Sequence, residues 1–148
     1  MLALAKTDYE QDFALWVEQT VAFLKAKDYA AVDWPNLIEE VEGLTRSDRR
    51  ELENRLITLF EHALKRRYVA LPDCYRGWEV TLLRTQYRLK QILDDSPSLR
   101  NYFLGIMEKC YQNAAKNIRR EYDAILPEVI PFDQEIDKLL NEEFWQLQ

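Results

Sequence analysis

Apolar residues recur every three or four positions along almost the whole chain, which is the period of an α-helix. No stretch alternates between apolar and polar residues for long enough to predict a β-strand. The pattern therefore predicts an all-α protein: a single-domain, up-and-down bundle of five to six helices, in which short connections join antiparallel neighbours.

Three helices are predicted in the first half of the chain. The first covers about residues 8–26 and begins with a capping box, in which Thr7 is the N-cap and Glu10 reaches back to it. The second begins at Asp33 and Pro35, and Gly43 predicts its end near Thr45. Ser47 is expected to cap a third helix that runs to about Tyr68. The faces expected to turn inward are formed by Tyr9, Phe13, Trp16, Val17, Thr20 and Leu24 on the first helix, Trp34, Leu37, Val41 and Leu44 on the second, and Leu52, Leu56, Leu59, Phe60 and Ala63 on the third.

Pro72 and Gly77 are expected to bracket a loop, after which Trp78 opens a fourth helix to about Leu93. Ser96 and Pro97 are expected to end the fourth helix and to begin a fifth, over about residues 97–125. Its predicted seam contains Leu104, Met107, Tyr111, Ala114, Ile118, Tyr122 and Ile125. Asp133 is expected to cap a short last helix with Ile136, Leu139 and Leu140 inside, and Phe144 and Trp145 to anchor the chain.

The fourth helix carries apolar residues on two sides. Trp78, Leu82, Leu89 and Ile92 form one stripe, and Val80, Leu83 and Tyr87 lie nearly opposite. A helix that is apolar on two sides is either central in its own bundle or covered by a partner. The second stripe therefore has two interpretations: it is buried within the chain, or it is an interface.

Composition fits a folded protein of one domain. The chain has 148 residues, of which 47% are hydrophobic and 31% charged, and its net charge is −6. We assign residues 1–148 to one helical domain, with short flexible ends at about 1–6 and a proline-bounded connection at 127–132. No apolar run is long enough to span a membrane, and the apolar start is too short for a signal peptide. Cys74 and Cys110 are expected to be reduced thiols, and the expected location is cytoplasmic.

Four segments resemble a known bacterial family in the same order. They are NLIEEVEGL (36–44), RSDRRELENRL (46–56), SPSLR (96–100) and the closing FW (144–145), and the opening YEQDFALWVEQTVAFL (9–24) also resembles the start of that family. The family is domain of unknown function 29, with largely cyanobacterial members. The resemblance implies a compact, helical, up-and-down fold and a cyanobacterial source. It implies no activity, so it transfers no catalytic or ligand residue.

Glu40 and His62 form the first candidate site. Glu40 lies at the shoulder of its buried stripe and would need an arginine or backbone donors if it were partly buried. His62 lies at the shoulder of the third helix. Together they are half of a metal or acid–base site if the two helices converge; otherwise Glu40 forms a structural ion pair and His62 a hydrogen bond. No Glu-x-x-His pair and no second histidine is present, and we expect no cofactor. Cys110 could in principle pair with His62 as a nucleophile, but its place on an apolar helix face favours a packing role.

A basic, aromatic segment is the second candidate site. Residues 45–120 hold 16 Lys and Arg against 9 Asp and Glu, whereas the rest of the chain holds 4 against 17. The candidate binding residues are Arg66, Arg67, Arg84, Arg88, Tyr87 and Leu83. Such a patch can meet phosphates and stack on bases, meet an acidic protein surface, or be a solvated face with internal ion pairs. No phosphate-binding loop or nucleic-acid-binding motif accompanies it, so nucleic acid is the weaker alternative.

Three functional hypotheses follow, and whether the chain is an enzyme stays open. The first is a non-catalytic protein-interaction module that binds another protein or a second copy. The second is a metal-binding or acid–base enzyme that uses Glu40 and His62. The third is weak nucleic-acid binding through the basic patch, which would weaken steeply with salt.

Overall fold

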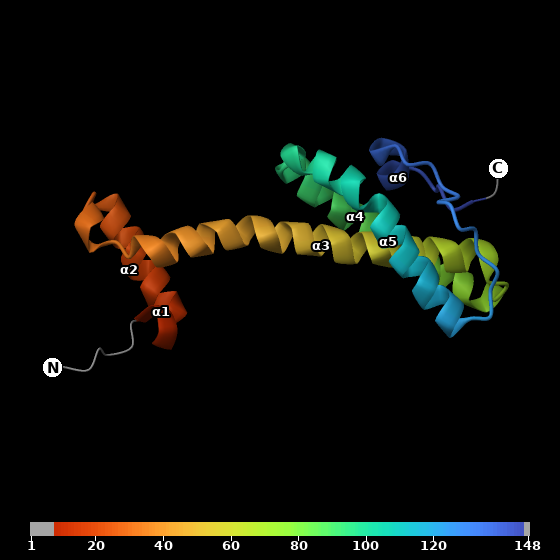
Figure 1. The fold of residues 1–148 in the computed structure, drawn as a ribbon, viewed down its shortest axis with the longest axis horizontal. Helices are drawn as coiled ribbons and strands as arrows, with labels where there is room; N and C mark the ends of the chain where they lie inside the picture. Colours follow the sequence, from red (N-terminus) through yellow and green to blue (C-terminus); the bar gives the residue numbers. More distant parts are fainter. Residues whose placement is uncertain (1–7, 147–148) are drawn as a thin grey trace. The chain divides into compact units, whose positions relative to one another are not determined.

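The computed structural model describes residues 8–146, and over that range it contains helices and no strand. The all-α class and the predicted number of helices are confirmed. The helices follow in the order α1 (Asp8–Gln11), α2 (Phe13–Lys25), α3 (Trp34–Tyr68), α4 (Pro72–Asp95), α5 (Arg100–Glu121) and α6 (Ile136–Asn141), with short 3₁₀ turns η1 (Tyr29–Ala31) and η2 (Pro97–Leu99) (Figure 1). The predicted Thr7 cap and the flexible start at 1–6 lie outside the described residues.

Backbone contacts divide the chain into two compact units, residues 1–46 and 47–148. Helix α3 contributes its first turns to the first unit and the rest to the second. The assignment of all 148 residues to one domain stays a prediction.

The predicted first helix is interrupted at Asp12, so it forms α1 and α2. The Asp12 carboxylate accepts a hydrogen bond from the Leu15 amide at 3.1 Å, which is the geometry of an N-cap. Helix α2 ends in a Schellman motif around Lys27, whose φ of 59° is left-handed. The Lys27 amide donates to the Leu24 carbonyl, and the Asp28 amide donates to the Phe23 carbonyl. This motif turns the chain toward η1 and α3.

The second and third predicted helices are one helix, α3 (Figure 1). Asp33 caps its start as expected, since its carboxylate accepts from the Asn36 amide at 3.4 Å. The predicted stop at Gly43 and the predicted cap at Ser47 are wrong. A glycine inside a helix costs only about 1 kcal/mol relative to alanine, and Arg46 forms ion pairs with Glu39 and Glu42 across it.

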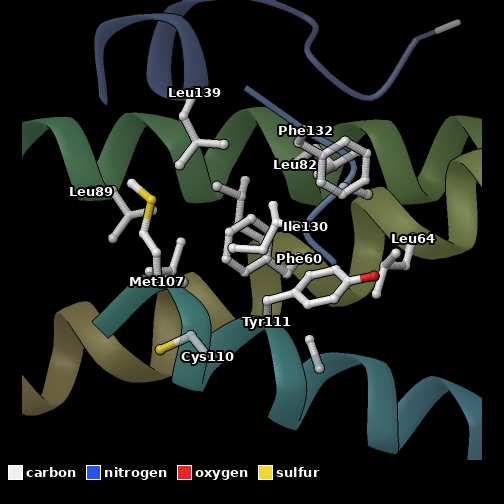
Figure 2. Close-up of a cluster of buried hydrophobic side chains, with 14 of the residues drawn as sticks. Phe60, Leu64, Leu82, Leu89, Met107, Cys110, Tyr111, Ile130, Phe132 and Leu139 are labelled. Atoms are coloured by element: carbon white, nitrogen blue, oxygen red, sulfur yellow. The ribbon is translucent and has the colours of Figure 1, made fainter. Parts of the chain in front are cut away.

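The second unit holds the continuous hydrophobic core. Figure 2 shows Phe60 and Leu64 of α3, Leu82 and Leu89 of α4, and Tyr111 of α5 meeting at its centre, with Leu139 of α6 at one side. All the inward residues predicted for residues 47–68 are fully buried, and the first stripe of α4 is buried too. Trp145 is buried beside Phe144, so the predicted C-terminal anchor is confirmed.

Helix α4 starts six residues earlier than predicted, at Pro72, so no loop separates Pro72 from Gly77. Proline is favoured in the first turn of a helix, because a backbone amide there has no acceptor within the helix and its absence costs no hydrogen bond. Helix α5 ends at Glu121 rather than near Ile125, which is 95% exposed. Leu104 is also exposed, so these two residues do not belong to the predicted α5 seam.

The connection at 127–132 is non-helical, as expected, but it is part of the core. Ile130 and Phe132 are buried, and the Phe132 ring stacks on Phe60 with centroids 6.3 Å apart. The Tyr111 hydroxyl donates to the Pro127 carbonyl at 2.6 Å and fixes the start of the connection. The expected Asp133 cap of α6 is wrong: the N-cap is Glu135, and the Asp133 carboxylate accepts from the Glu135 amide just before the helix begins.

Candidate functional site

Glu40 and His62 are not brought together. Both lie on α3, whereas a convergent site would need them on two neighbouring helices. Within one helix only residues three or four positions apart face each other, and these two are 22 positions apart. The expected convergence fails because the two helices on which it relied are a single helix.

Each of the two side chains has a local partner. The Glu40 carboxylate accepts a hydrogen bond from the Tyr9 hydroxyl at 2.5 Å, so its partner is a phenol and not an arginine. The His62 ring lies 2.9 Å from the Thr58 carbonyl through Nδ1, which must carry the proton because a carbonyl only accepts. Burial lowers the pKa of His62 below its usual value, although this hydrogen bond opposes the shift. Among residues 8–146, no group of three or more His, Cys, Asp or Glu residues could hold a metal ion.

Most of the candidate arginines have partners within the second unit. Arg66 Nε donates to Glu79 at 2.7 Å, and its guanidinium lies 4.0 Å from the centroid of the Tyr75 ring. Arg67 lies near the Tyr68 and Phe132 rings and donates a long hydrogen bond, 3.4 Å, to the Pro131 carbonyl. Arg66 and Arg67 therefore interact with acidic, carbonyl and aromatic groups of their own unit.

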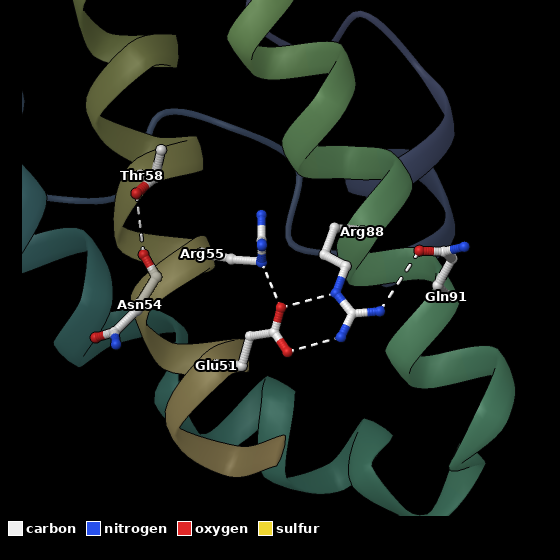
Figure 3. Close-up of polar contacts among 6 residues, drawn as sticks. All are labelled: Glu51, Asn54, Arg55, Thr58, Arg88 and Gln91. Atoms are coloured by element: carbon white, nitrogen blue, oxygen red, sulfur yellow. Dashed lines mark hydrogen bonds and ion pairs between the residues drawn. The ribbon is translucent and has the colours of Figure 1, made fainter. Parts of the chain in front are cut away.

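Arg88 forms a two-pronged ion pair with Glu51. Its Nε and one terminal nitrogen donate to the two Glu51 oxygens at 2.7 and 2.8 Å, and Arg55 donates to the same carboxylate at 2.6 Å (Figure 3). Such a two-pronged contact joins α3 to α4 with a fixed geometry. The Arg88 guanidinium, followed by Arg55, lowers the pKa of Glu51 to about 2. Of the four candidate arginines, Arg84 is the one that is exposed and has no ion pair among the described residues.

Cys110 is a buried packing residue. Its thiol lies 3.6 Å from the Glu53 carbonyl, and burial raises its pKa to about 12. A thiol with so high a pKa is almost entirely protonated at neutral pH and is a poor nucleophile. This agrees with the packing role that the helix position predicts, and the nucleophile interpretation has no support.

The most distinctive surface of the first unit is an apolar groove between α2 and the first turns of α3. It encloses about 290 Å³. It is lined on α2 by Phe13, Trp16, Val17, Thr20, Val21 and Leu24, and on α3 by Leu37, Glu40, Val41 and Leu44. We call this surface the N-terminal groove.

Several side chains of the N-terminal groove are exposed although they are apolar. Phe13 is 49% exposed, Val41 56% and Leu44 68%. The sequence interpretation placed these three residues inside, and the structure contradicts it: they line the groove and are exposed, with no other part of residues 8–46 covering them. The two polar side chains in the lining each have a partner: Thr20 donates to the Trp16 carbonyl, and one oxygen of Glu40 accepts from the Tyr9 hydroxyl.

A second apolar surface lies on the outer side of α4. Val80, Leu83 and Tyr87 are all exposed, so the second stripe of this helix is not buried within the chain. The Tyr87 hydroxyl accepts a hydrogen bond from Gln91, one turn further along. This stripe is smaller than the N-terminal groove and lies on one helix instead of between two.

Reasoning from the sequence missed the groove as a site because it assigned each apolar stripe to an interior. The width of the apolar stripes on these two helices was a signal that could have indicated the groove. Val21 and Ile38 lie beside the predicted inward faces and are also apolar, so the apolar surface of these two helices is wider than one contact between them can cover. Both residues are exposed.

The described residues define an all-α protein with apolar faces exposed on its helices. The chain belongs to the family described as Domain of unknown function DUF29, whose family model matches residues 9–145. No curated protein and no solved structure was found to match it. No helix among the described residues is long and apolar enough to cross a membrane.

Proposed function

We propose that the protein is a non-catalytic interaction module, and that the N-terminal groove binds the apolar face of a helix in a protein partner. The observation that carries the proposal is the exposure of contiguous apolar side chains along both walls of the groove. Soluble monomers rarely leave large contiguous apolar patches in water, and such patches commonly mark interaction sites.

The shape of the groove favours a helix as its occupant. Phe13, Val17 and Val21 are spaced four residues apart and form a ridge along α2. Ridges of this spacing interdigitate with the side-chain rows of a neighbouring helix. An amphipathic helix that lays its apolar face into an apolar groove is a common mode of protein recognition.

The chemistry of the lining supports binding over catalysis. Sites for small polar substrates have a few convergent polar groups that orient the ligand. In the N-terminal groove, Thr20 and Glu40 are the polar side chains, and each already has a partner within the unit. Binding in the groove would therefore be driven by the burial of apolar surface.

Photo-crosslinking in cells that naturally contain the protein tests this proposal. A benzophenone amino acid replaces Val41 in the groove, and a control chain carries it at Glu42, the next residue, which is exposed and directed away from the groove. We expect the chain labelled at 41, and not the control, to form a discrete adduct whose cross-linked peptide maps to the apolar face of a helix. No adduct at 41, or equal adducts at both positions, would contradict the proposal.

A further inference from the structure

We infer that the helix which fills the N-terminal groove belongs to a second copy of this chain, so that two copies pack their first units face to face. This inference rests on the proposed function and names its partner. The contact would be formed by α2 and the first turns of α3 from each copy, four helices in all.

The first unit lacks a core of its own. Among residues 8–46, Trp16, Thr20 and Val32 are the buried residues, and the other apolar side chains of α2 and early α3 are partly or largely exposed. A unit of 46 residues is already near the lower limit at which a hydrophobic core can stabilise a fold. The groove therefore needs a permanent cover, and a second copy is present wherever the chain is present.

The exposed apolar area is large enough for a stable dimer. In the lining of the groove, Phe13, Val17, Val21, Val41 and Leu44 are each between 38% and 68% exposed. At ordinary side-chain areas these fractions amount to roughly 500 Å², which matches the largest patches seen on monomers. Two such faces together reach about 1,000 Å², the least that a specific interface usually buries.

The polar groups of the groove also favour an identical partner. A face with no unsatisfied donor or acceptor can pack on a copy of itself without burying an unpaired polar atom. Thr20 meets this condition through its bond to the Trp16 carbonyl, and one oxygen of Glu40 is held by the Tyr9 hydroxyl. A partner recognised by its charge would instead need open charged groups around the groove.

Charge predicts how such a dimer responds to salt. Residues 1–46 hold nine Asp and Glu against four Lys and Arg, and among the residues that line the groove Glu40 is the one acidic side chain. Two copies therefore repel each other weakly through acidic groups outside the contact. Salt screens this repulsion, so the dimer should be as tight or tighter at high salt. Binding of a basic helix would weaken instead.

Light scattering on the full chain, across a range of protein concentrations and at two salt concentrations, tests the inference. The variants are Val41→Glu and Leu44→Glu, with Leu83→Glu on the outer stripe of α4 as the matched control. All three side chains are more than half exposed, so the substitutions should leave the fold intact, and circular dichroism checks this.

We expect the unchanged chain and the Leu83→Glu variant to have twice the mass of one chain. Either groove variant should weaken the dimer about a hundredfold, because each copy would place a carboxylate in an apolar contact. Dissociation of the unchanged dimer should not increase with salt.

Three results would overturn the inference: a monomer at every concentration, a dimer that survives both groove variants, or a dimer that salt dissociates. A dimer lost only in Leu83→Glu would place the contact on α4. If the chain is monomeric but still cross-links through residue 41 to a different protein, the second copy is the wrong partner and the proposed function stands. If neither a dimer nor an adduct forms, both proposals fail.

Discussion

At the scale of single residues, the most consequential contact is the one between Glu51 and Arg88. In the two-pronged geometry, Arg88 Nε donates to one Glu51 oxygen and a terminal nitrogen of Arg88 donates to the other, and Arg55 adds a third bond. The pKa of Glu51 is therefore lower in the folded chain than the usual 4.5. A carboxyl whose pKa falls on folding stabilises the fold above its unfolded pKa, and this contribution disappears as the pH falls from about 4.5 toward 2.

Arg88→Gln tests this assignment. Because Arg88 is the largest cause of the shift, we expect the pKa of Glu51 to rise from about 2 toward its usual value, as measured by NMR titration of the Glu51 carboxyl carbon. Acid unfolding should begin at a higher pH in the variant. The control is Arg84→Gln, which changes an exposed arginine on the same helix and should leave the Glu51 pKa unchanged. A Glu51 pKa that stays near 2 in Arg88→Gln would show that Arg88 does not set it.

At the scale of the elements, α3 is the main difference between the sequence expectation and the structure. The sequence predicts two helices, one on each side of Gly43, because glycine weakens a helix and Ser47 can cap one. A weak position is not a break, however, because the hydrogen bonds of the helix continue through it and Arg46 bridges it by ion pairs.

Replacing this glycine should therefore stabilise the helix. The Gly43 backbone is helical, and an added Cβ would meet the Arg46 side chain at 3.6 Å, an ordinary contact. We expect Gly43→Ala to raise the free energy of unfolding of the first unit by about 1 kcal/mol. Thermal and urea denaturation, followed by circular dichroism, measure the change. An alanine that destabilises the chain would mean that the helix is not continuous at this position.

The sequence predicted the helical class and the second unit well, and the reason is visible in particular residues. Leu52, Leu56 and Phe60 follow a strict helical spacing and have α4, α5 and α6 to pack against. The residues that the spacing predicts to be inside are therefore buried. Phe13, Val41 and Leu44 follow the same spacing but have no element of the first unit to cover them. Spacing tells which residues share a face, but not whether another part of the chain meets that face.

The candidate site was less predictable for related reasons. The possible Glu40–His62 site depended on two separate helices, but both residues lie on the single helix α3. Arg66 and Arg88 form ion pairs with Glu79 and Glu51, respectively. Which charged residues pair is decided by contacts between helices, and single-sequence patterns do not contain that information. The exposed second stripe of α4, by contrast, was one of the two outcomes that its pattern allowed.

At the scale of the whole molecule, the two units differ in how much of their apolar surface they bury. The second unit closes its own core with α3, α4, α5, α6 and the connection before α6. The first unit leaves the N-terminal groove open, with nearly all of its lining apolar. Under the proposed function, the part of the chain that binds is the part that leaves most of its apolar surface exposed.

Hydrogen exchange of the α2 backbone amides, measured at low and high protein concentration, tests this account most directly. If two first units cover each other, dilution uncovers the groove, and α2 amides should exchange faster at low concentration while core amides of α4 and α5 do not change. The contact between two first units would be contradicted if α2 amides exchange at the same rate at both concentrations. This holds when the chain is not already fully associated at the lower concentration.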